Sequence, residues 1–160
     1  MHAPSPESTG NRETRPSPQN LLAAISWALL VTAMFGGYAL LGMLTTGDNL
    51  TDHEEQFFRA GHGHAGVLAA IGILYSSYLG RTLLSARTQI VAWCVYLGGV
   101  LLMSGGMFAH MIVGEPGSGS WGTTMTVLGA IVLAIAVLYL AWGLFQARNV
   151  GFGSLVKGSK

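Results

Sequence analysis

Charged residues and cysteine are both scarce in this sequence. Its 160 residues include 8 Lys and Arg and 7 Asp and Glu, and the formal net charge is +1. A chain this weakly charged has no basic field that would attract nucleic acid, so we expect no such partner. The only cysteine, Cys94, excludes an internal disulfide, a CxxC redox or zinc motif and the CxxCH attachment of a c-type haem.

Apolar residues dominate instead and make up 51% of the chain. They form four long segments, at about 21–44, 57–79, 90–113 and 121–145. Each segment meets the need for about 20 mostly apolar residues to cross a hydrocarbon core about 30 Å thick. Backbone polar groups must be paired within each segment in lipid, so we expect helices. The sequence therefore predicts an all-α integral membrane protein, a four-transmembrane-helix up-and-down bundle over residues 21–147.

The basic residues indicate how the spans are oriented. Seven of the eight flank the chain ends and the loop between the second and third spans: Arg12, Arg15, Arg81, Arg87, Arg148, Lys157 and Lys160. Only Arg59 lies toward the other side, at the start of the second span, and the two loops on that side instead carry most of the acids. Because loops rich in Lys and Arg stay in the cytoplasm, we expect both termini there and a multi-pass protein of the cell membrane.

Polar tails flank the predicted bundle. Residues 1–20 are rich in Pro, Ser and Thr and cannot bury a core, so we expect them to be disordered or bound to a partner. Residues 148–160 are interpreted as a short C-terminal tail. The short connections between spans leave no room for a separate soluble domain.

Glycine is abundant, with 23 residues, and many of these lie inside the spans. Small residues let helix backbones approach closely, especially at small-xxx-small spacing. The candidates for such helix packing are Gly61, Ala65, Gly66, Ala69, Gly99 and Gly106. Space for a flat macrocycle against the backbone is the alternative interpretation.

The segment FFRAGHGHAGVL places His62 and His64 at the start of the second span. Helical residues two apart point to nearly opposite faces, so this pair cannot ligate one ion together. His62 shares a face with Glu55 and Arg59, which predicts a polar network at the membrane interface. His64 shares a mostly apolar face, where an unsatisfied polar group is costly, and so needs a partner across the bundle.

We expect that partner on the third span, where Met107 and His110 lie near the outer end. Antiparallel pairing would bring His64 and His110 to a similar depth. Imidazole and thioether ligands suit copper, above all Cu(I), with His64, His110 and Met107 as first candidates and His62 or His53 in reserve. Alternatively, His64 and His110 form the axial pair of a haem b. The third option is a cluster without any cofactor, which relays or senses protons.

No nucleophile–base pair, phosphate-binding loop or catalytic carboxylate pair is evident in the spans, so we expect no independent enzymatic activity. The preferred interpretation is a small accessory or structural subunit that stabilises or assembles a larger membrane complex, a copper- or haem-dependent oxidoreductase. Its partners would be other integral membrane subunits and lipid. The alternatives are a stand-alone b-type cytochrome in electron transfer and a proton- or metal-responsive membrane sensor.

Overall fold

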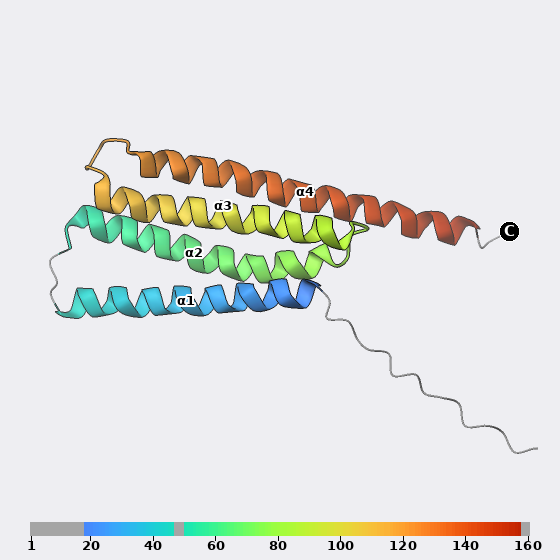
Figure 1. Cartoon of the computed structure of the whole chain (residues 1–160), viewed down its shortest axis with the longest axis horizontal. Coiled ribbons are helices and arrows are strands. Elements are labelled where there is room, and N and C mark those ends of the chain that lie inside the picture. The colour runs from blue at the N-terminus through green and yellow to red at the C-terminus, as the bar shows by residue number, and fades with distance from the viewer. Residues whose placement is uncertain (1–17, 47–49, 158–160) are drawn as a thin grey trace, which may run out of the picture.

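The computed structural model describes residues 18–46 and 50–157, with side chains described up to Arg148. Its four helices are α1 (Pro18–Thr46), α2 (Asp52–Leu79), α3 (Ala86–Val113) and α4 (Trp121–Lys157). They lie side by side in chain order and each runs antiparallel to the one before it (Figure 1). The predicted all-α, four-helix up-and-down bundle is confirmed.

Three of the helices are long and apolar enough to cross a membrane: Pro18–Thr46, Ala86–Val113 and Trp121–Arg148. They indicate a multi-pass membrane protein. Helix α2, which contains the predicted 57–79 span, does not reach this level of hydropathy within the described residues. The reason lies in its composition, because charged residues fill its first turns and His62 and His64 follow them.

Helix α2 also begins earlier than the predicted span, because a capping box fixes its start. The Thr51 hydroxyl accepts a hydrogen bond from the Glu54 backbone N–H at 3.3 Å, and the Glu54 carboxylate accepts one from the Thr51 N–H at 2.8 Å. The Thr51 hydroxyl also donates to this carboxylate. The hydrogen bonds from the Thr51 backbone and side chain lower the pKa of Glu54 below its ordinary value. This cap places His53 and Phe57 in the first turns of an ordered helix.

Glycines set the closest helix contacts, which join α3 to α4. A Cβ added at Gly99 would lie 2.7 Å from Leu133 Cγ, and one at Gly106 would lie 2.6 Å from the Gly122 carbonyl oxygen. Gly61 on α2 similarly accommodates the Phe108 ring, at 3.1 Å from the position of its missing Cβ. Backbones this close leave no room for larger side chains.

Two stacked tyrosines lie at the centre of the core. The rings of Tyr75 and Tyr96 are 4.5 Å apart between centroids, and both side chains are buried. The Tyr75 hydroxyl donates to the Ala136 carbonyl on α4 at 3.0 Å, while the Tyr96 hydroxyl donates to the Leu68 carbonyl on α2 at 2.7 Å. These hydrogen bonds tie α2, α3 and α4 into one unit. Helix α1 packs chiefly against α2 and stays largely exposed.

The helices extend into both predicted tails. In the predicted C-terminal tail of 148–160, α4 continues as a helix to Lys157 and projects past the other helices (Figure 1). Apolar residues such as Leu155 and Val156 continue the helical sequence there. Of the predicted tail of 1–20, Pro18 and the two residues after it already belong to α1, and 1–17 lie outside the described residues.

Candidate functional site

His110, on the last turn of α3, is the most deeply buried imidazole in the described part of the chain, at 5% exposure. Its Nδ1 lies 2.7 Å from the Ser120 hydroxyl and 3.3 Å from the Thr123 hydroxyl, at the beginning of α4. The Ser120 hydroxyl also accepts a hydrogen bond from the Gly122 N–H at 3.1 Å, as an N-cap side chain does. The α4 cap therefore holds the His110 ring by one nitrogen and leaves Nε2 for a ligand.

Two glycines make this arrangement sterically feasible. The Gly114 N–H donates to the His110 carbonyl at 2.7 Å, and a Cβ on Gly114 would collide with the His110 ring. A Cβ on Gly122 would collide with the His110 backbone. The turn between α3 and α4 can thus close over the histidine only because both positions lack a side chain.

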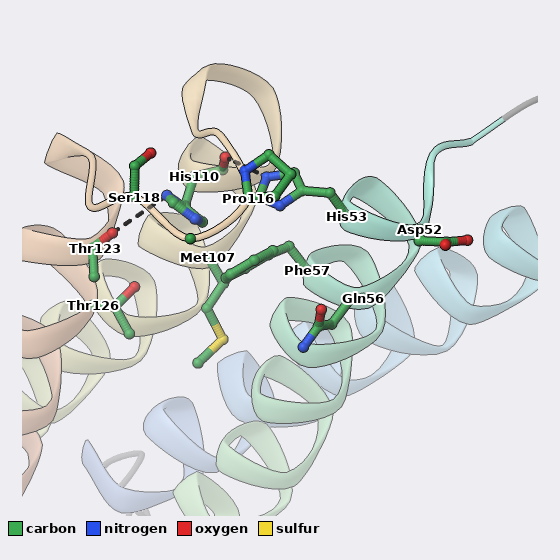
Figure 2. Close-up of a pocket in the computed structure, with 11 residues that line it drawn as sticks. Asp52, His53, Gln56, Phe57, Met107, His110, Pro116, Ser118, Thr123 and Thr126 are labelled. Carbon is green, nitrogen blue, oxygen red and sulfur yellow. Dashed lines mark hydrogen bonds between the residues drawn. The ribbon is translucent and has the colours of Figure 1, made fainter.

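Helix α2 adds two rings to the site. The His53 ring lies 5.2 Å from the His110 ring between centroids, and the Phe57 ring lies 4.3 Å from it. Phe57 and His53 also contact each other at 4.8 Å. His53 Nε2 is 3.4 Å from the His110 carbonyl oxygen, at the long end of hydrogen bonding. Figure 2 shows the two histidines and Phe57 gathered beneath the loop that carries Pro116.

These rings border an open pocket of about 690 Å³ at the end of the bundle where α2 begins. Its wall is made of Asp52, His53, Gln56, Phe57, Met107, His110, Pro116, Gly117, Ser118, Thr123 and Thr126. Met107 contributes a thioether, but its sulfur points away from the imidazoles, and so does the Asp52 carboxylate (Figure 2). Within the described ranges, no group of three or more His, Cys, Asp or Glu side chains is placed to hold a metal ion. A three-ligand metal site here would therefore need Met107 as the third ligand.

The expected pairing of His64 with His110 is not formed. The His64 side chain is exposed, its Nδ1 lies 2.8 Å from the Ala60 carbonyl oxygen on its own helix, and it does not line the pocket. The apolar face of α2 predicted to contain His64 is broader than the face that is buried. Gly61 and Leu68 contact α3, while His64 lies at the outer edge of the predicted face. A haem held between His64 and His110 of one chain therefore has no support in this arrangement.

The predicted polar network is formed only in part. Glu55 and Arg59 are joined by an ion pair one turn apart. His62 makes no bond to either residue and lies against α1, where its ring contacts the positions of the missing side chains of Gly36 and Gly37. The two histidines do face different directions, as helical geometry requires.

No protein family, curated protein or solved structure matches this chain. Ser120 and Thr123 are not among the site residues predicted from the sequence. A serine just before an apolar helical run is a typical N-cap, so this signal could have indicated Ser120 as the start of α4, but not its contact with His110.

Proposed function

We propose that this chain is a four-span membrane protein with both termini in the cytoplasm. The arrangement of the helices supports α2 as the fourth span. Helices α1 and α3 run in the same direction, so α2 must return across the membrane if both are spans. Arg81 and Arg87 lie between α2 and α3, at the opposite end of the bundle from the His53–His110 pocket, which supports an outer-side position for this pocket.

Within this topology, the chain serves as a small subunit that assembles with or stabilises a larger membrane complex. Large apolar side chains are exposed along every helix, including Phe35 on α1 and Leu138 on α4. Lipid and the helices of other subunits are both suited to cover them. Gentle purification from the native membrane should recover the 16.8 kDa chain with defined integral membrane partners. A monodisperse chain with no partner would contradict the subunit role.

The His53–His110 pocket is the ligand site of this subunit, and the ligand that suits it best is copper. One observation carries this proposal: a buried histidine is oriented through Nδ1 beside a second imidazole, with a thioether in the same wall. Ligating histidines are commonly fixed through their other ring nitrogen in this manner. Two imidazoles and a thioether suit Cu(I), once the Met107 side chain turns toward the rings.

Competition of the purified chain with a chromogenic Cu(I) chelator tests the copper site. His110→Ala and Met107→Leu should each abolish tight binding, while Ser120→Ala should weaken it by about 10- to 100-fold, because it removes an outer-shell partner. His64→Ala is the matched control, since it removes an imidazole that does not line the pocket. Equal Cu(I) affinity in the His64 and His110 variants would overturn the assignment, with folding verified by circular dichroism.

A further inference from the structure

A second cavity, of about 350 Å³, lies between α1, α2 and α3, away from the His53–His110 pocket. Its wall is mostly apolar and includes Leu29, Ala69, Leu97, Val100 and Phe108. Three side chains in the wall carry hydrogen-bonding groups, namely Thr32, His62 and Ser104. The Thr32 hydroxyl already donates to the Ala28 carbonyl at 3.1 Å. The other two decide what the cavity can bind.

Ser104 is 5% exposed, and its hydroxyl has no hydrogen-bond partner in the described part of the chain. Other serines in these helices donate to a backbone carbonyl four residues earlier, as Ser26 does at 3.1 Å and Ser77 at 2.9 Å. A buried hydroxyl without a partner is costly, and inside a membrane water is scarce. The hydroxyl oxygen is itself covered in this conformation, so it is suited to donate a hydrogen bond to a molecule that enters from lipid once the side chain turns toward the cavity that Ser104 lines.

His62 provides a second donor. Neither of its ring nitrogens is hydrogen-bonded within the described ranges. The ring packs closely against α1 because Gly36 and Gly37 have no side chains there. A Cβ on Gly37 would lie 2.9 Å from His62 Nε2. Nδ1 instead lies beside Gly36, which lines the cavity, whereas Gly37 does not, so the tautomer with its proton on Nδ1 is the one suited to donate into the cavity.

From these features we infer that the cavity binds the head group of a membrane-soluble quinone. Such a ring is flat, uncharged and apolar, and it carries carbonyl oxygens that accept hydrogen bonds from His62 and Ser104. The Phe108 ring offers an aromatic wall for it. The cavity volume lies within the range of small-molecule sites, which are mostly apolar with a few polar groups. A hydrocarbon chain would fill the same space but leave both donors without partners.

The test uses the full chain in detergent and a decyl-substituted benzoquinone as the probe, with binding measured by titration calorimetry. Ser104→Ala should weaken binding by about 2- to 10-fold, the loss expected for one hydrogen bond. Gly105→Leu should block binding, because Gly105 lines the cavity and a Cβ there meets no atom within 4 Å. The variant should therefore fill part of the cavity, and circular dichroism checks that the helices are retained.

Gly98→Leu is the matched control. Gly98 lies two turns earlier on the same face of α3, also with open space around its Cβ position, but outside the cavity wall. It should bind the quinone as the parent chain does. Decylbenzene, which has the same tail and no carbonyl, should bind more weakly. Equal binding of the two probes, or unchanged quinone affinity in both Ser104→Ala and Gly105→Leu, would show a lipid groove only and overturn the inference.

Discussion

The tandem glycines of α3 offer a sharp test of the packing. At the pair Gly98 and Gly99, the first position is open, whereas a Cβ on the second would lie 2.7 Å from Leu133 Cγ. The pair Gly105 and Gly106 repeats this pattern one heptad later. Substitution by alanine should therefore have opposite consequences at neighbouring positions of one helix.

The magnitude follows from two terms. Replacing a helical glycine by alanine favours the helix by about 1 kcal/mol at an open position. At Gly99 and Gly106 the same gain is opposed by about 1–3 kcal/mol of overpacking, because backbone or core atoms must shift. Since the substitution is identical, the propensity term cancels between neighbours. The difference between Gly98→Ala and Gly99→Ala should be about 1–3 kcal/mol, and likewise at Gly105 and Gly106.

Reversible unfolding in mixed micelles, followed by circular dichroism as the denaturing detergent increases, measures these differences. Gly98→Ala and Gly105→Ala should equal or exceed the parent chain in stability, and Gly99→Ala and Gly106→Ala should fall below their neighbours. If both members of each pair have equal effects, the helices do not approach at these glycines and the reasoning is refuted.

Three further results are expected. Ser120→Ala should destabilise the fold by about 0.5–2 kcal/mol, because it removes the cap of α4 and the partner of His110; no change in the unfolding midpoint would contradict this role. Tyr75→Phe should cost about 0.5–1.5 kcal/mol in the same assay through loss of one buried hydrogen bond, and a neutral result would mean that the bond contributes nothing. Hydrogen bonds from Thr51 lower the pKa of Glu54 below the ordinary value of 4.5. The ionised carboxylate therefore stabilises the fold at pH values above 4.5, and this stabilisation is lost as the pH falls through the lower pKa of the folded state. Glu54→Gln should therefore flatten the acid limb of a plot of stability against pH, and an unaltered acid limb would show that the cap carries no pH-linked stability.

The bundle itself was predictable from sequence, because four long apolar runs with short polar connections allow few other arrangements. The position of His110 near the end of the third span was also predictable, since it lies just before the loop that follows this span. The rotation of α2 was not. It is set by close contacts such as Gly61 with Phe108 and by the Tyr75–Tyr96 stack, which single-sequence periodicity does not resolve. A rotation of a fraction of a turn moved His64 from the expected groove to the surface.

The same limit applies to the polar partners of the site. Ser120 lies next to His110 only because Gly114 and Gly122 let the intervening turn close tightly. Contacts of this kind depend on the geometry of a loop, whereas hydropathy reports only which segments are buried in lipid. The site residues that the sequence did not predict are therefore those contributed by loops and helix caps.

The unequal attachment of the helices implies an order of mechanical failure. Helix α1 is joined mainly to α2, with 11% of its most apolar 18 residues buried against 39% for α3. Helices α2, α3 and α4 are joined to one another by the hydrogen bonds of Tyr75 and Tyr96. A force that pulls on the N-terminus should extract α1 in a first, weak event and the remaining three helices in a second, stronger one. Removal of α1 also takes away the wall formed by Gly36, so the cavity beside His62 would open sideways to the bilayer at the first event.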